Sequence, residues 1–304
     1  MVQSRPRESK LWEYINRTHI TEEKIQDLTN FKSDSINHKL SIWNPRTNGV
    51  RYLKELIFYI CTTLSSREWN KLTKIHKKET GGPYSIRFNN ETVCLDYLQA
   101  VLEVTFIEDY FDFQDASVIE IGAGYGRTCH AILSNYDIDQ YTIIELKHAL
   151  EVAKRYLKIV LDKKRYKKIA FVDIDHFDDT KNQQYDLCIN IDSFSEMDED
   201  TVRLYLKFIN EQCGNFFVKH PVGKYMDKSL DAHSEGKKVV KMALTTGLLR
   251  DIIDIHDNRE VARQSQKFIR AYCPSIKWEC VKHGWAKPWS FYWQAIYRKK
   301  GDSW

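Results

Sequence analysis

The sequence has few of the features that mark secreted, membrane-spanning or metal-stabilised proteins. The segment Met1–Arg7 is polar and leads into further polar residues, so we expect no secretory signal. The longest apolar patch, residues 53–64, is interrupted by Lys54 and Glu55 and is too short to cross a bilayer. The seven cysteines are scattered, with no C-x-x-C pair and an odd total, which favours free thiols over disulfides or a zinc site. We therefore expect a cytoplasmic protein with no membrane span.

An excess of one charge is also missing. The 46 Lys and Arg residues are balanced by 42 Asp and Glu, which leaves a net charge of +4. A basic run at residues 163–168 is followed closely by an acidic run at residues 173–179. A basic run of this size more often covers a solvated helix face than a nucleic-acid site, so we expect no nucleic-acid partner.

The order of elements divides the chain into two parts. Up to about residue 115, apolar residues recur at helical spacing, with a break at residues 80–83. From Ser117 onward, short apolar strands alternate with helical segments, which predicts a parallel sheet with helices on both faces. The last two strands are too close together for a parallel crossover and should be antiparallel. We expect the strands at residues 117–121, 141–145, 169–172, 185–190, 215–219, 275–281 and 290–297.

This order predicts an α/β fold. We expect a Rossmann-like sheet of seven strands, mostly parallel with the last strand antiparallel, preceded by an N-terminal helical extension. The extension would span residues 1–90 and act as a substrate cap or as a homodimer interface, and the sheet domain would span residues 91–304. The long connection between the fifth and sixth strands predicts a substrate lid at about residues 225–270.

The turn after the first strand of the sheet is the most distinctive stretch. It reads VIEIGAGYGRT, and three of the chain's twelve glycines, Gly122, Gly124 and Gly126, fall within five residues. In an open parallel sheet, ligands bind at the carboxyl ends of the strands. Glycines there allow positive φ values and the close approach of a ligand to the backbone. A cofactor site is therefore expected at this turn.

The glycine spacing separates the candidate cofactors. Arg127 stands where the third glycine of the dinucleotide motif G-x-G-x-x-G would fall, and no G-K-[ST] follows for a phosphate loop. Glu120, two positions before the first glycine, suits a cationic ligand better than a pyrophosphate. Glu145 ends the second strand, where an acid can accept hydrogen bonds from ribose hydroxyls, although NAD-binding folds place an acid there too. S-adenosylmethionine has an ammonium and a sulfonium and no phosphate, so it fits this pattern.

At these residues the chain resembles the class I S-adenosylmethionine-dependent methyltransferases, from about Ser117 to Lys300. The segments VIEIGAGYGRT, INIDSFSEM, GNFFVKHPVGKY and GGPYSIRFNNETV are similar to those of the bacterial sugar O-methyltransferases of polysaccharide and glycoside pathways. The resemblance implies S-adenosylmethionine as cofactor. It also implies a set of cofactor-binding residues: Glu120 near the amino group, Gly122, Ala123, Gly124, Tyr125 and Gly126 for the methionine part, Glu145 for the ribose, Asp173 for the adenine, Asn190 and Ser193 beside the sulfonium, and in addition Leu146 and Ile174. Asp173 could equally serve only as a cap in its acidic run.

The acceptor chemistry points to the ends of the fourth and fifth strands. A sugar hydroxyl is a poor nucleophile while protonated, so a base or a metal should help to remove its proton. Candidates for the base are His220, Glu196 and Asp192, with His233 in reserve, and a histidine has a suitable ordinary pKa of about 6.5. Glu196 also fits an S-x-x-E capping box. Magnesium, held by Asp192 with Glu196 or Asp198, is allowed but not required.

The sequence therefore predicts an S-adenosylmethionine-dependent O-methyltransferase that methylates a hydroxyl of a sugar or sugar conjugate, such as a polysaccharide, nucleotide-sugar or glycoside. Alternatives are an NAD(P)-dependent oxidoreductase, a methyltransferase for another small molecule or for nucleic acid, and a non-catalytic scaffold. A nucleic-acid methyltransferase is disfavoured because the chain lacks the segment [DN]-P-P-[YF]. Four C-terminal aromatic residues either stack on a sugar or pack within the last hairpin: Trp285, Trp289, Tyr292 and Trp293.

Overall fold

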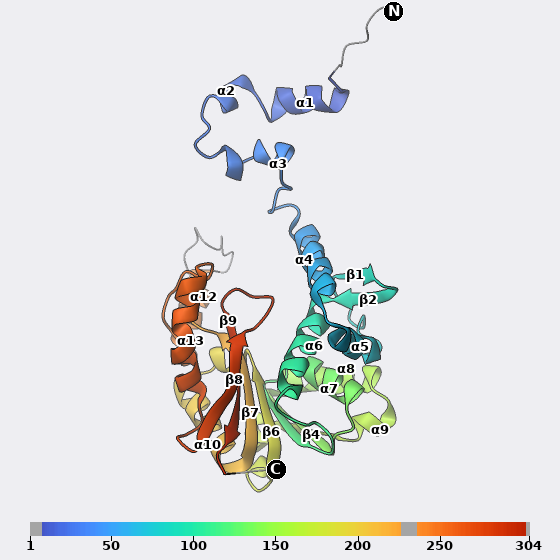
Figure 1. The fold of residues 1–304 in the computed structure, drawn as a ribbon, viewed down its shortest axis with the longest axis vertical. Coiled ribbons are helices and arrows are strands. Elements are labelled where there is room, and N and C mark those ends of the chain that lie inside the picture. Colours follow the sequence, from blue (N-terminus) through green and yellow to red (C-terminus); the bar gives the residue numbers. More distant parts are fainter. Residues whose placement is uncertain (1–7, 226–235, 302–304) are drawn as a thin grey trace, which may run out of the picture. The chain divides into compact units, whose positions relative to one another are not determined.

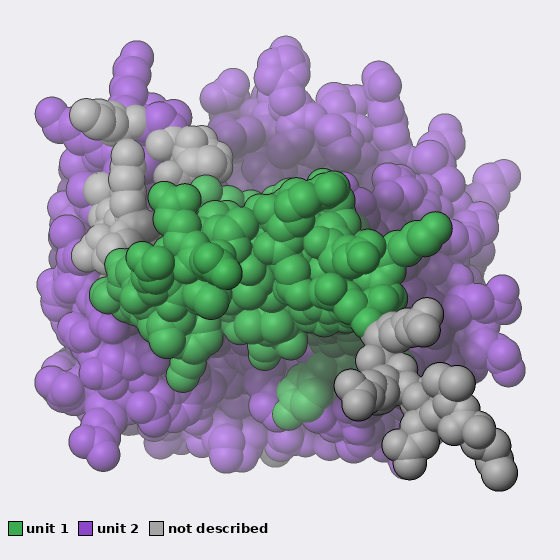
Figure 2. All heavy atoms as spheres, turned by 90° about the horizontal axis from the view of Figure 1, so that it is seen from above, with its two compact units in different colours: residues 1–59 green, residues 60–304 purple. Residues whose placement is uncertain are grey.

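The computed structural model describes residues 8–225 and 236–301 of the chain. These residues belong to two compact units, Met1–Tyr59 and Ile60–Trp304, coloured separately in Figure 2. The second unit contains residues 60–90, which the sequence analysis placed in the extension. Within the described residues, no helix is long and apolar enough to span a membrane.

The first unit consists of short helices joined by turns. They are α1 (Lys10–Thr18), α2 (Glu22–Ile25), η1 (Phe31–Ser33), α3 (Asn37–Leu40) and the start of α4 (Gly49–Thr63). The hydroxyl of Ser9 caps α1 by accepting the Trp12 N–H, and the Arg51 guanidinium lies 3.2 Å from the centre of the Trp43 ring. The role expected for the extension, a substrate cap or homodimer interface, stays a prediction.

The second unit opens with two helices separated by a hairpin. The helix α5 (Ser66–Lys74) starts with a capping box between Ser65 and Glu68. The hairpin pairs β1 (Ser85–Phe88) with β2 (Glu91–Cys94), and α6 (Leu95–Glu108) follows directly. We expected helical spacing up to about residue 115, so this hairpin is a correction.

The seven-stranded sheet that follows confirms the expected fold class (Figure 1). Its strands are β3 (Ser117–Ile121), β4 (Gln140–Glu145), β5 (Ile169–Asp173), β6 (Tyr185–Ile191), β7 (Cys213–Pro221), β8 (Trp278–Trp285) and β9 (Tyr292–Lys299). The order is β5-β4-β3-β6-β7-β9-β8. The strands from β3 to β7 are parallel, whereas β9 is antiparallel to both β7 and β8.

Helices cover both faces of the sheet because its central strands are apolar on both sides. They are α7 (Arg127–Asn135), α8 (Lys147–Val160), α9 (Lys163–Tyr166), η2 (Ile174–Thr180), η3 (Ser193–Ser195), α10 (Glu199–Gln212), α12 (Lys237–Thr245) and α13 (Asn258–Tyr272). In Figure 1, α6, α7 and α8 lie on one side of the sheet, and α10 and α13 on the other. The core includes Phe268 and Tyr272, so α13 is a core helix inside the segment where we expected a lid. The lid stays a prediction for the remaining part, and residues 226–235 lie outside the described residues.

Candidate functional site

The ends of five parallel strands meet at one edge of the sheet. Parallel pairing places the residues after β3, β4, β5, β6 and β7 next to one another, and the register sets Glu145 directly opposite Asp173. The glycine turn, Glu145, Asp173 and Asp192 therefore belong to one carboxyl edge, where ligands of such sheets bind.

All three glycines of the turn have a positive φ, of 74° at Gly122, 57° at Gly124 and 90° at Gly126. L-residues avoid this region. A Cβ at Gly122 would lie 2.2 Å from the Ser193 hydroxyl oxygen, and one at Gly126 would lie 2.7 Å from a methyl of Leu157, so both positions are packed. A Cβ at Gly124 would meet no atom within 4 Å. The middle of the turn thus presents its backbone to open space, as a cradle for a ligand requires.

Glu145 closes one side of this cradle. Its carboxylate accepts the N–H of Gly124 at 2.8 Å and that of Leu146 at 2.7 Å. Next to it, Asp173 accepts the N–H of Asp175 at 3.1 Å, so it does cap η2, while Ile174 stays half-buried. A carboxylate retains further lone pairs for ribose hydroxyls. Capping and cofactor binding are therefore compatible at this position.

Glu120 lies enclosed beneath the turn. Its side chain is buried, and its carboxylate accepts the hydroxyl of Tyr141 at 2.7 Å. Burial raises the pKa of Glu120 to about 7, although the hydrogen bond from Tyr141 opposes this. Glu120 therefore carries only part of a negative charge at neutral pH, and its expected contact with a ligand amino group stays a prediction.

Asn190 and Ser193 fasten the end of β6 to the end of β3. The Asn190 amide donates to the carbonyl of Ile121 at 2.7 Å and to the Ser193 hydroxyl at 2.6 Å. The Ser193 hydroxyl in turn donates to Ile121 at 3.1 Å. These hydrogen bonds fix the carbonyl of Ile121, directly before Gly122. Asn190 and Ser193 therefore stabilise the glycine turn as well as lying beside it.

Asp192 combines three unusual properties. Its φ of 66° is rare for a residue other than glycine, which indicates local backbone strain. Its Oδ1 is buried and has no hydrogen-bond partner among the described residues. Burial raises the pKa of Asp192, and the Tyr292 hydroxyl also interacts with the carboxylate. Strain and an unpaired buried oxygen are typical of a functional residue.

His220 is enclosed on the other face of the sheet, which corrects its expected role as a base. Its ring lies between Phe194 and Tyr272, with centroids 5.9 Å and 4.9 Å away, and has no exposed surface. Neither ring nitrogen has a hydrogen-bond partner within the described part of the chain. Burial lowers the pKa of His220 to about 3. In this position the ring cannot reach an acceptor hydroxyl.

The other candidates are placed differently. Glu196 is exposed after η3, and the helix has no side-chain cap, so the capping-box interpretation is wrong. Over the ranges that the structure describes, no group of three or more His, Cys, Asp or Glu side chains could hold a metal ion. Magnesium at Asp192 therefore stays a prediction. His233 lies outside the described residues.

A buried charge network lies beneath the site, and its central residue, Glu103, was not among the site residues expected from the sequence. Glu103 of α6 accepts the guanidinium of Arg127 at 2.8 Å through one oxygen and the amine of Lys219 at 2.6 Å through the other. Arg127 also donates to the carbonyl of Asp96, whose carboxylate accepts the Tyr125 hydroxyl at 2.9 Å. Helix α6 thus binds one residue of the glycine turn, Tyr125, and the residue directly after the turn, Arg127. A signal was available, because Glu103 lies at helical spacing from Ala100 on the same apolar face of the helix, where an acid is unusual.

Aromatic side chains adjoin the same network. Gln99 accepts the Lys219 amine at 3.3 Å and the Trp289 indole N–H at 3.0 Å, and the Lys219 amine lies 5.7 Å from the centre of the Tyr292 ring. By contrast, Trp285 and Trp293 pack on each other, with ring centroids 4.8 Å apart. The last hairpin therefore uses one aromatic pair for packing and places the other pair beside the site.

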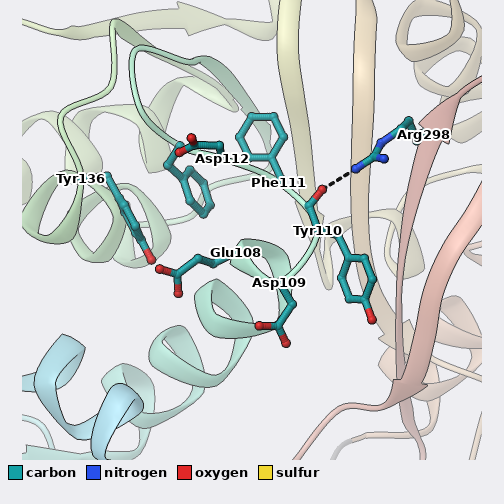
Figure 3. Close-up of a pocket in the computed structure, with 8 residues that line it drawn as sticks. Glu108, Asp109, Tyr110, Phe111, Asp112, Tyr136 and Arg298 are labelled. Carbon is teal, nitrogen blue, oxygen red and sulfur yellow. Dashed lines mark hydrogen bonds between the residues drawn. The ribbon is translucent and has the colours of Figure 1, made fainter. Parts of the chain in front are cut away.

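A hollow of about 560 Å³ at the opposite edge of the sheet is separate from this site (Figure 3). It lies between the end of α6, the segment before β3 and the end of β9, where Arg298 donates to the carbonyl of Tyr110 at 2.5 Å. Two of its carboxylates, Glu108 and Asp109, are bound by Arg67 at 2.6 Å each. None of the site residues expected from the sequence lines it.

Comparison with solved structures finds similar folds at low identity. The methyltransferase domain of bacterial CtHen1 is 16% identical, with 66% of this chain and 98% of that chain covered and a TM-score of 0.47. The glycopeptide N-methyltransferase MtfA, complexed with S-adenosylmethionine, is 13% identical over 66% of this chain and 87% of that one, with a TM-score of 0.42. The mitomycin 7-O-methyltransferase MmcR is 12% identical over 88% of this chain and 71% of that one, also with a TM-score of 0.42. Identities this low specify no activity for this chain.

No protein-family model and no curated protein matches the sequence.

Proposed function

We propose that this protein is an S-adenosylmethionine-dependent methyltransferase. The observation that carries the proposal is the cradle at Gly124, where the backbone faces open space between the glycine turn and the Glu145 carboxylate. The antiparallel β9 beside β7, which the sequence predicted together with the motif, supports it.

The residues of the carboxyl edge fit this cofactor. The turn Gly122–Gly126 would hold the methionine part, Glu145 and Leu146 the ribose, and Asp173 and Ile174 the adenine. When bound, S-adenosylmethionine supplies an activated methyl group. The protein then has to align the acceptor with it, and alignment alone supplies about 7–11 kcal/mol in well-oriented reactions.

The alternative of an NAD(P)-dependent oxidoreductase is weakened by Arg127. This residue replaces the third glycine of the dinucleotide motif, and its guanidinium is bound by Glu103 and by the carbonyl of Asp96. It is therefore engaged with α6 instead of being available to a phosphate.

We further propose that the acceptor is a hydroxyl of a sugar or sugar conjugate. Asp192, with its unpaired oxygen and raised pKa, would act as the base that removes the hydroxyl proton, with Glu196 as second candidate. Tyr292 interacts with the Asp192 carboxylate, and Trp289 binds Gln99 of the adjoining network, so we expect these two rings to stack on the apolar face of a sugar ring. The seven free cysteines support the proposed cytoplasmic location.

Isothermal titration calorimetry tests the cofactor first. We expect S-adenosylhomocysteine to bind and NAD(H) and NADP(H) not to bind, and the reverse result would overturn the proposal. A panel of nucleotide-sugars, glycosides, small phenols and RNA, incubated with methyl-labelled S-adenosylmethionine, then tests the acceptor. Methyl transfer to a phenol or to RNA, and not to a sugar, would overturn the proposed sugar acceptor. The proposed methyltransferase activity would then still stand.

A further inference from the structure

The charges beneath the site are arranged around one carboxylate. Glu103 is 2% exposed and binds two cations, Arg127 directly after the glycine turn and Lys219 at the end of β7. The backbone of Lys219 also contacts that of Asp192, whose N–H donates to the Lys219 carbonyl at 3.0 Å. The three charges thus extend from the cofactor side of the site to the acceptor side.

Glu103 is the carboxylate that binds both cations, and these cations favour its ionised form. Burial alone would raise its pKa, but the adjacent Arg127 and Lys219 outweigh burial and hold the pKa below its usual value. The pKa values of Glu120 and Asp192 are raised instead, by burial. Without Glu103, Arg127 and Lys219 would lose the carboxylate that they share, in a region of low dielectric constant.

Such an excess of positive charge would act against a cationic cofactor. S-adenosylmethionine carries a sulfonium, whereas S-adenosylhomocysteine has a neutral thioether at the same place and is otherwise alike. We propose that Glu103 is a specificity-determining residue that, by offsetting one of the two positive charges of Arg127 and Lys219, allows the site to accept a sulfonium cation. The proposal rests on the proposed cofactor and goes beyond it, because it assigns the charge preference to a residue of α6.

The test is the ratio of two dissociation constants, that of S-adenosylmethionine divided by that of S-adenosylhomocysteine, measured by calorimetry on the full chain. At an effective dielectric constant of about 20, a unit charge about 10 Å from a cation changes its affinity by about tenfold. We expect Glu103→Gln to raise the ratio about tenfold. A purely structural role for Glu103 would weaken both ligands equally and leave the ratio unchanged.

Two further variants keep the test decisive if Glu103→Gln does not fold. Lys219→Met removes one of the cations and should lower the ratio, by up to about tenfold. The double variant Glu103→Gln, Lys219→Met leaves Arg127 as the charged member of this group, with the same net charge as the three residues have in the wild type. The ratio of dissociation constants should therefore return to that of the wild type. Glu108→Gln, on the same helix but bound to Arg67 and Lys71, serves as the control with no effect.

The outcomes separate this proposal from the proposed function. If the wild-type protein binds neither ligand, the cofactor proposal fails before any variant is made. If the wild type binds both, and the ratio stays within about twofold in Glu103→Gln and in Lys219→Met, the cofactor stands and the role of Glu103 is overturned.

Discussion

Lys219 and His220 are neighbours in β7, yet they lie in opposite environments. Successive side chains of a strand point to opposite faces of the sheet. Lys219 faces α6 and binds Glu103, whereas His220 faces α13 and lies against Tyr272. Both are buried, but among the described residues only the Lys219 side chain has polar partners. The α6 face of the strand ends therefore carries the polar chemistry, and the α13 face belongs to the core.

The largest expected effect concerns Asp192 on the polar side. Asp192→Asn removes the proposed base, and methyl transfer to the acceptor found in the panel should fall by between about a hundredfold and ten-thousandfold. Affinity for S-adenosylhomocysteine should stay near that of the wild type. Asp200→Asn, an exposed acid eight residues further along the chain, is the matched control. If Asp192→Asn transfers the methyl group at the wild-type rate, Asp192 is not the base, and the role passes to Glu196 or to a metal.

A smaller effect is expected at the cofactor end of the same face. Glu145→Ala removes a carboxylate that would accept charge-assisted hydrogen bonds from the ribose, so S-adenosylhomocysteine should bind on the order of a hundredfold more weakly. Calorimetry measures the affinity and circular dichroism the fold. Glu151→Ala, at an exposed position of α8, should change neither. Unchanged affinity in Glu145→Ala would remove Glu145 from the ribose site.

The smallest effect on activity is expected on the core side. His220→Phe should leave methyl transfer close to that of the wild type, because the enclosed ring does not reach the acceptor. A tenfold loss of transfer in a folded His220→Phe protein would return His220 to the active site.

The same variant should change the dependence of stability on pH. The pKa of His220 is about 3 in the folded protein and about 6.5 in the unfolded chain, so between these values the unfolded state binds more protons. The stability that the neutral ring contributes is therefore complete above about pH 6.5 and is lost as the pH falls toward 3, by about 1.4 kcal/mol per pH unit. The stability of His220→Phe should therefore fall less steeply between pH 6.5 and 3 than that of the wild type. His148→Phe, at an exposed position, should show the same pH dependence as the wild type. Urea unfolding at pH 7, 5.5 and 4 measures the difference.

The sheet could be predicted from the sequence because its signals are local. The strand expected at residues 117–121 coincides with β3, and the antiparallel end follows from a connection too short for a crossover. The hairpin β1–β2 was missed because the apolar spacing of the residues up to about 115 favoured helices. Its turn residues, Asn89 and Asn90, both have a positive φ, which is the pattern of a type I′ turn, so this signal was present.

The polarity of the two faces could not be predicted in the same way. The end of β7 is buried on both sides, so the sequence does not show which face each side chain occupies. His220 follows a lysine and precedes a proline, and nothing local shows that aromatic rings from Phe194 and Tyr272 enclose it. The partners of Glu103 likewise come from β7 and α7, far along the chain. These features depend on tertiary packing.

The close contact between Gly122 and Ser193 restricts the order in which this site can evolve. A side chain at residue 122 would collide with both the hydroxyl oxygen and the Cβ of Ser193, so residue 193 must become glycine before residue 122 can carry a side chain. Even then, the φ of 74° at residue 122 would admit few replacements, chiefly asparagine or aspartate. Substitutions at these two positions should therefore occur in a fixed order. Among relatives of this chain, we expect a side chain at residue 122 only where residue 193 has already changed.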